Sequence, residues 1–259
     1  SDYPDFEVLN AKADIRIDYD PTEDFNFTFS TGYSWSKLNQ VTGTGRYLAD
    51  GYQYTYYLLR SRFKNLSGTF YINEGNSGDT RGYNLGNRIK DESKNISLGG
   101  QHWLWLPSNQ YPKSTRLIYG FDYFKTISNS NGTILNDGPN GYDNDGDNAA
   151  LESDGIDNDD DGVIDEEKEG IDEPDEYFDI ESNEYGGYIQ TKTDVLGDEQ
   201  WELIVAARFD HHDQLDEGLQ FGPKFGLKYH PNENSEWRLT YGLAYNTPTI
   251  TTLYTDLYY

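Results

Sequence analysis

Residues 25–37 read FNFTFSTGYSWSK, a stretch in which large apolar or aromatic side chains alternate with small polar ones. One face carries Phe25, Phe27, Phe29, Thr31, Tyr33 and Trp35, and the other carries Asn26, Thr28, Ser30, Gly32, Ser34 and Ser36. Successive side chains of a β-strand point to opposite faces, so this alternation predicts a strand between two different environments. Lipid on one side and water on the other, in a membrane-spanning barrel, would produce this pattern.

The composition of the 259 residues favours a barrel wall over a packed sandwich. Apolar residues make up 35% of the chain and aromatic residues 15%, including 23 tyrosines. A barrel wall needs one apolar face and aromatic girdles but no thick dry core. No run of about 18 apolar residues occurs, so no transmembrane helix is predicted. Because the chain has no cysteine, it has no disulfide and no thiolate metal site.

Ten segments with this alternation are predicted to be strands. They are residues 11–19, 25–37, 52–64, 67–73, 96–105, 115–125, 185–195, 201–210, 219–229 and 237–245. Turns near 21, 65, 109, 197 and 232 are short, whereas connections near 44, 84, 155 and 214 are longer. Outer-membrane barrels combine short periplasmic turns with longer extracellular loops. The alternative at this point is an antiparallel sandwich with uneven loops.

Four blocks in the last third carry a resemblance to a known family. They are EYGGYIQ at 184–190, ARFD at 207–210, FGPKFGLKY at 221–229 and RLTYGLAYNTPT at 238–249. Their order and spacing resemble the barrel of TonB-dependent outer-membrane receptors. The resemblance implies an all-β, antiparallel transmembrane barrel, typically of 22 strands around a plug. We therefore expect about ten strands of a larger barrel in the bacterial outer membrane, in contact with its lipid.

The same resemblance implies a transport function. The TonB system would act through a plug domain that this chain lacks, and the cargo would be a scarce small-molecule or oligomeric nutrient: an iron chelate, a cofactor, a glycan or a peptide. A surface lipoprotein is a further partner to consider, whereas nucleic acid is not. Transport requires no catalytic residue, so no enzymatic activity is expected. We interpret the chain as an internal portion of a longer receptor.

Two other functions remain open from the residues. The first is a self-contained ten-stranded outer-membrane barrel enzyme, with Asp210 and His212 in its site, although an ordinary extracellular rim is the simpler interpretation of these residues. The second is a calcium-dependent extracellular adhesion module built as a sandwich, with Phe25, Phe27 and Phe29 buried. Four tryptophans are better explained as girdle residues or strand-end anchors than as platforms for sugars: Trp103, Trp105, Trp201 and Trp237.

Negative charge is concentrated in one segment. The formal net charge is −26, and 21 of the 46 acidic residues lie between 137 and 184, where Lys168 is the only basic residue. Such a block attracts cations and repels nucleic acid and anionic lipid. We therefore divide the chain into barrel strands at 1–125, an acidic extracellular loop of calcium-binding type at 126–184, and further barrel strands at 185–259.

The acidic loop contains a loose repeat: GYDNDGD at 141–147, GIDNDDDG at 155–162 and GIDEPDE at 170–176. In the second copy, Asp157, Asp159 and Asp161 occupy positions one, three and five of a calcium loop, and Asp165 occupies position nine. Alternate carboxylates on one side are the ligands that Ca²⁺ prefers, and a glycine at position six allows the sharp turn. Lys168 stands at position twelve, where a bidentate glutamate is usual.

The other copies fit less well. In the first, Asp143, Asp145 and Asp147 have the spacing and Asp154 falls at position twelve, but the glycine comes early. In the third copy Pro174 replaces a ligand position. The alternative is a disordered, solvated acidic loop. The ordered spacing favours structural Ca²⁺ sites that stiffen the loop over the extracellular mouth.

Overall fold

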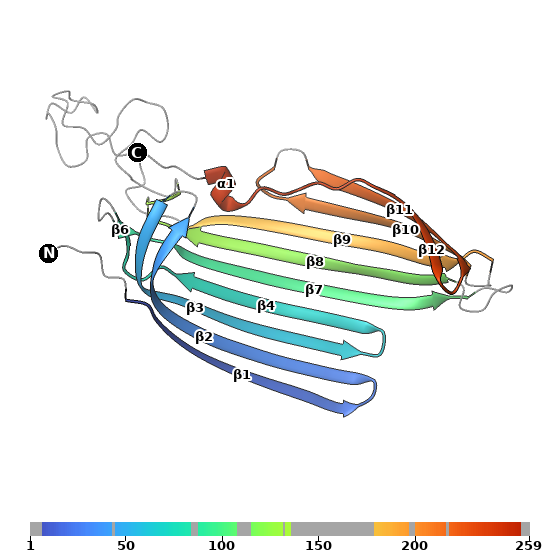
Figure 1. The fold of residues 1–259 in the computed structure, drawn as a ribbon, viewed down its shortest axis with the longest axis horizontal. Coiled ribbons are helices and arrows are strands. Elements are labelled where there is room, and N and C mark those ends of the chain that lie inside the picture. The colour runs from blue at the N-terminus through green and yellow to red at the C-terminus, as the bar shows by residue number, and fades with distance from the viewer. Residues whose placement is uncertain are drawn as a thin grey trace, which may run out of the picture.

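The chain folds into one antiparallel sheet whose long strands follow one another in space in chain order (Figure 1). The computed structural model describes residues 7–42, 45–83, 88–107, 115–131, 133–135, 179–196, 200–215 and 218–254. The long strands are β1 (Leu9–Thr22), β2 (Phe25–Thr42), β3 (Gly45–Phe63), β4 (Leu66–Asn76), β7 (Glu92–Leu106), β8 (Thr115–Asn129), β9 (Ile180–Asp194), β10 (Trp201–His212), β11 (Leu219–Asn232) and β12 (Ser235–Gly242). The expected ten-stranded antiparallel wall is confirmed.

The register gives the sheet two chemically different faces. One cross-strand row, on what we call the apolar face, runs Ile17, Phe29, Leu59, Phe70, Leu98, Tyr123 and Tyr185. A neighbouring row, on what we call the polar face, runs Asp18, Thr28, Arg60, Thr69, Gly99, Asp122, Gly186, Asp210 and Gln220. Residues opposite each other on paired strands share a face, so the period-two alternation of each strand is in phase across the whole sheet.

Burial is inverted relative to a water-soluble protein. Small polar residues of β2 are buried, with Thr28 and Ser30 each 8% exposed, whereas Ile17 is 54% and Leu239 72% exposed. The sandwich alternative is wrong, because it requires a second sheet over the phenylalanines of β2, and the described strands form one sheet only. An exposed apolar face of this extent matches a surface that contacts lipid.

Aromatic residues border the apolar face near both ends of the strands. At one end, Trp201 stacks on Tyr229 with ring centroids 4.1 Å apart, and Trp237 pairs with Tyr229. At the other end, Tyr185 stacks on His211. Trp201 and His211 are ten positions apart on β10, which is about 34 Å of strand and, at a tilt of about 45°, about 24 Å of height. This height matches the apolar band of an outer-membrane barrel.

Two of the tryptophans are strand-end residues of β7 and not part of a girdle. Trp103 and Trp105 pair with Ile118 and Arg116 and lie on the polar face, where the Arg116 guanidinium lies 5.5 Å from the centroid of the Trp103 ring. Residues 101–106 read QHWLWL, which places apolar side chains on both faces. Composition alone therefore does not tell which face of this strand end contacts lipid.

The longer connection expected near residue 44 is instead an extension of the β2–β3 hairpin. The strands stay paired from Lys37 and Asp50 to Thr42 and Gly45, beyond a bulge at which Gly51 has a φ of +79°. Glycine adopts this left-handed conformation without a steric penalty, so the hairpin continues past the irregularity. The longer connection expected near residue 84 also contains strands: β5 (Thr80–Gly82) and β6 (Arg88–Ile89) form a small hairpin on the extended β3.

The edges of the sheet are β1 and β12, and the described residues contain no pairing between them. The ten-stranded barrel enzyme requires that pairing, so the structure does not support a closed ten-stranded barrel. None of the helices in the described ranges is long and apolar enough to cross a membrane.

Adjacent residues of β9 provide a test of the two faces. Ile189 is 46% exposed on the apolar face near the middle of the band, whereas Gln190 lies on the polar face opposite Ala206. We expect Ile189→Arg to lower the free energy of unfolding by about 2–4 kcal/mol, because a charge at mid-membrane must leave water. Urea unfolding of the intact protein in lipid bilayers measures the change. Gln190→Arg is the matched control, and an equal loss in both variants would contradict the assignment.

Candidate functional site

After β12 the chain turns back over the polar face. The hydroxyl of Tyr245 donates a hydrogen bond to Asp210 on β10, and Thr247 Oγ1 donates to Glu184 Oε2 on β9 at 3.2 Å. The short helix α1 (Ile250–Tyr254) follows, and the Tyr254 hydroxyl donates to Gln214. We call residues 243–254 the return segment. It crosses from the sheet edge to β9 at the end where the longer connections lie (Figure 1).

The return segment is held at its far end by a small apolar cluster. Ile250 packs with Leu135 and Ile180, which are 5% exposed each, and Tyr254 packs against this cluster. Leu135 is the last described residue before positions 136–178, and Ile180 opens β9, so described residues on either side of those positions meet at this cluster. Burial of these side chains holds the helix against the start of β9.

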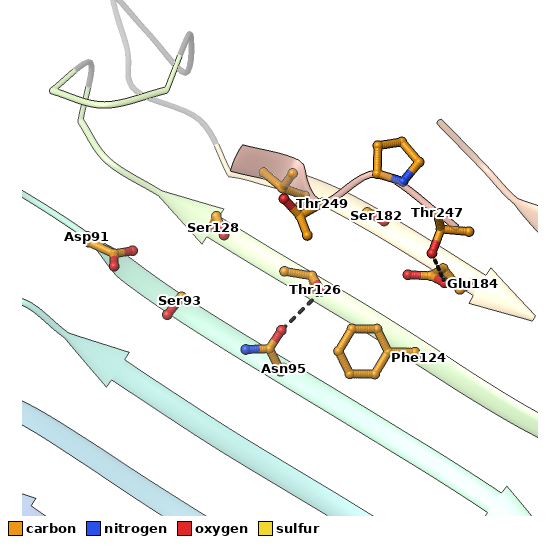
Figure 2. Close-up of a pocket in the computed structure, with 12 residues that line it drawn as sticks. Asp91, Ser93, Asn95, Phe124, Thr126, Ser128, Ser182, Glu184, Thr247 and Thr249 are labelled. Carbon is orange, nitrogen blue, oxygen red and sulfur yellow. Dashed lines mark hydrogen bonds between the residues drawn. The ribbon is translucent and has the colours of Figure 1, made fainter. Parts of the chain in front are cut away.

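A cavity of about 370 Å³ lies between the return segment and the polar face. Figure 2 shows side chains from β7, β8 and β9 forming its floor, with Thr247 and Thr249 of the return segment on the other side. We call it the mouth cavity. Its lining residues are Asp91, Ser93, Asn95, Phe124, Thr126, Ser128, Ser182, Glu184, Thr247, Pro248, Thr249 and Ile250.

Hydrogen bonds fix part of this lining. Thr126 Oγ1 donates to Asn95 Oδ1 at 3.0 Å, which joins β8 to β7 (Figure 2). Asp91 stands just before β7, and burial raises the pKa of its carboxyl group. The mouth cavity therefore presents hydroxyl and amide groups between two acidic residues, Asp91 and Glu184.

A charged cluster lies deeper on the polar face. Arg208 donates from Nη2 to Asp122 at 2.8 and 2.9 Å and from Nε to Asp210 Oδ2 at 2.7 Å. All three side chains lie over Gly186, where an added Cβ would collide with each of them. The two carboxylates compensate the guanidinium, and the hydrogen bonds hold it flat against the wall.

Asp210 and His212 lie on the polar face, as the alternation along this strand predicts, but they contact different residues. Asp210 binds Arg208 and Tyr245, whereas His212 is 3% exposed and contacts Ser182. The backbone N–H of Gln214 donates to His212 Nδ1, so Nε2 carries the proton and donates to Ser182 Oγ at 3.1 Å. Asp210 and His212 therefore contact different partners in the described residues and do not form the Asp–His pair of the enzyme alternative.

The eight aspartates proposed as calcium ligands lie outside the described residues. These are Asp143, Asp145, Asp147, Asp154, Asp157, Asp159, Asp161 and Asp165. Within the ranges that the structure describes, no group of three or more histidine, aspartate or glutamate side chains is placed to hold a metal ion.

Sequence reasoning did not identify the mouth cavity. The alternation of β7, β8 and β9 places Ser93, Thr126 and Glu184 on the polar face, so the floor of the cavity could have been predicted from the sequence. The opposite wall could not, because Thr247 lies more than 60 residues from its partner Glu184 in the chain.

Comparisons with known proteins agree with this geometry. A family model described as "TonB dependent receptor-like, beta-barrel" matches residues 2–259. The structure is similar to the siderophore receptor PirA from Pseudomonas aeruginosa (TM-score 0.53, 14% identity, 87% of this chain and 31% of that one). It is also similar to the alcaligin outer-membrane receptor FauA from Bordetella pertussis (TM-score 0.56, 13% identity, 87% and 34%). No curated protein sequence matches the chain.

A third similar structure is the ferric enterobactin receptor PfeA of Pseudomonas aeruginosa, in a mutant form in complex with enterobactin (TM-score 0.58, 14% identity, 94% of this chain and 34% of that one). The chain thus spans about a third of the length of these solved structures. At this level of identity the likeness establishes the fold.

The two adjacent glycines of β9 test the charged cluster. We expect Gly186→Ala to lower the free energy of unfolding by about 1–3 kcal/mol, because the new methyl group displaces Arg208 and its two carboxylate partners. Gly187→Ala is the matched control: its Cβ would meet only the Gly120 carbonyl oxygen, at 3.9 Å. Urea unfolding of the intact protein in lipid bilayers measures both, and an unchanged Gly186→Ala variant would show that the cluster does not constrain the wall.

Proposed function

Because the chain belongs to the TonB-dependent receptor-like β-barrel family, we propose that it forms part of the wall of an outer-membrane transporter that imports a scarce nutrient. The observation that carries the proposal is the family match over residues 2–259, together with a wall whose exposed face is apolar and whose other face is polar. The apolar face would contact outer-membrane lipid. The polar face would line the lumen.

The other parts of the transporter would come from outside this chain. Within the described residues β1 and β12 each pair on one side only, so they would require further strands, because an open sheet edge in hydrocarbon leaves backbone groups without partners. A plug domain would receive the force of the TonB system. The long connections, the mouth cavity and the acidic segment would lie on the extracellular side, where nutrient is captured.

The class of nutrient is part of the proposal. The similar structures are receptors described as binding a siderophore, alcaligin or ferric enterobactin. At 13–14% identity these names do not transfer, so an iron chelate, a cofactor, a glycan and a peptide are all candidates. A surface lipoprotein could deliver an oligomeric substrate. No catalytic step is invoked.

Energy dependence tests the transport proposal. We expect cells that depend on the imported nutrient to lose growth when the gene is deleted and to regain it with the intact gene. In a strain without TonB, the intact gene should not restore growth, because the plug cannot be displaced. Uptake of labelled nutrient measures the effect directly. Equal uptake with and without TonB would contradict the proposal.

We also propose that the acidic segment binds Ca²⁺ as a structural ion. Support comes from the spacing of Asp157, Asp159 and Asp161 and from its weaker copy at Asp143, Asp145 and Asp147. Leu135 and Ile180, which lie on either side of residues 136–178, pack with Ile250 in one apolar cluster, so the cation would bind in a loop whose flanking residues are already in contact. The cation would offset the mutual repulsion of the carboxylates.

Ligand substitution tests the calcium proposal. We expect the triple variant Asp157→Asn, Asp159→Asn, Asp161→Asn to lose at least one bound Ca²⁺ per intact protein, measured by equilibrium binding of radioactive calcium. A second triple variant removes the same charge from the acidic segment outside the aspartate spacing: Asp137→Asn, Glu173→Gln, Glu176→Gln. This control should retain the stoichiometry. An equal loss in both variants would indicate diffuse counterion attraction instead of a site.

A further inference from the structure

We propose that the mouth cavity binds the ammonium group of a small, hydroxyl-rich ligand, such as an amino sugar. The proposal rests on the proposed transport function and names the chemistry of its cargo: a positively charged nutrient. The observations that carry it are the charge of the lining, a serine without a partner, and an apolar strip in the same cavity.

The charge of the lining excludes anion recognition. Among the described residues, the mouth cavity contains two carboxylates, Asp91 and Glu184, and no lysine, arginine or histidine. An anionic ligand would meet repulsion with no compensating cation. The acidic segment, with 21 acidic residues between 137 and 184, would also concentrate cations near this end of the wall.

The carboxylate of Asp91 is the group that we expect a bound cation to contact. It stands between β6 and β7 at the upper end of the mouth cavity, and Figure 2 shows its carboxylate on the cavity side, near Ser93. Burial raises the pKa of this carboxyl group, and no described cation forms an ion pair with it. Asp91 is only partly exposed, and an ammonium group in hydrogen-bond range would compensate the loss of water around its carboxylate.

Ser128 supplies the second, independent indication of a ligand. Its side chain is 9% exposed and lines the mouth cavity, opposite Ser93 in the β7–β8 register. Within the described residues its hydroxyl has no hydrogen-bond partner. This hydroxyl is not among the fully buried polar atoms, so it opens into the mouth cavity and is free to form a hydrogen bond with a polar group of a ligand.

The rest of the lining suits the carbon skeleton of such a ligand. Phe124 lies at the floor, and Pro248 and Ile250 of the return segment lie on the other wall. These apolar surfaces alternate with Asn95 and Thr126, whose mutual hydrogen bond fixes their orientation. A volume of about 370 Å³ lies within the range of small-molecule sites. A ring with polar edges and apolar faces therefore fits this cavity.

Three disaccharides of similar size separate the possible charges of the ligand. Isothermal titration calorimetry on the intact protein in detergent at pH 6.5 would compare deacetylated chitobiose, which carries ammonium groups, with neutral N,N′-diacetylchitobiose and with an anionic glucuronic-acid disaccharide. We expect the ammonium form to bind at least about tenfold more tightly than the neutral form, and the anionic form more weakly still. Equal or tighter binding of the neutral or anionic form, or no binding of the ammonium form, would overturn the proposal.

Adjacent carboxylates provide the matched variants. We expect Asp91→Asn to weaken binding of the ammonium disaccharide about tenfold and to leave the neutral one unchanged. Glu92→Gln removes the same charge one residue along, on the apolar face, where Glu92 accepts a hydrogen bond from Asn76, and should change neither affinity. An Asp91→Asn protein that stays folded, by its heat-modifiable gel mobility, and keeps the ammonium preference would overturn the assignment.

The calorimetry does not involve TonB, so the two proposals fail separately. TonB-dependent uptake with no charge preference in the calorimetry would retain the transporter and overturn the cationic cargo. A charge preference with TonB-independent uptake would retain the ammonium site and overturn the transport mechanism.

Discussion

Every long strand of this wall depends on its neighbours for its backbone hydrogen bonds. In hydrocarbon no water replaces a missing partner, so a spanning sheet must be a continuous ladder. The described strands meet this requirement from β1 to β12 in chain order. The ladder also explains the near absence of a core: few apolar side chains are buried, and the one buried apolar cluster in the described residues lies at the rim, around Ile250. Register, and not core packing, specifies the fold.

The same constraint shapes the polar face. Long side chains there lie flat over glycines: Tyr56 over Gly32, Tyr188 over Gly120, and Arg208 over Gly186. Each glycine provides room that a Cβ would fill, and each long side chain then reaches a partner on another strand. Tyr56 donates to Asp14 at 3.0 Å, and Tyr188 donates to Gln101 at 2.7 Å. The polar face is thus cross-linked by side chains in a layer that keeps close to the wall.

The sequence predicts the wall because the wall follows a local rule. Alternation with period two identifies the long strands, and parity places Asp210 and His212 on the polar face. The rule fails where a strand end is apolar on both faces, as at Trp103 and Trp105. It also fails where a glycine bulge lets a hairpin continue, as at Gly51. Both failures arise because lipid contact and strand length depend on neighbouring strands, which local composition does not encode.

The candidate site depends on contacts that no local pattern encodes. The floor of the mouth cavity belongs to the ladder, but the return segment is fixed by side-chain hydrogen bonds to Asp210, Glu184 and Gln214 and by the cluster around Ile250.

Isolated side-chain hydrogen bonds contribute about 1 kcal/mol each, so these contacts hold the return segment less strongly than the continuous backbone ladder holds the long strands. We therefore expect the floor of the mouth cavity to be more rigid than the wall formed by the return segment. A ligand that contacts both Asp91 and the return segment would lower the free energy of the arrangement in which this segment lies over the cavity.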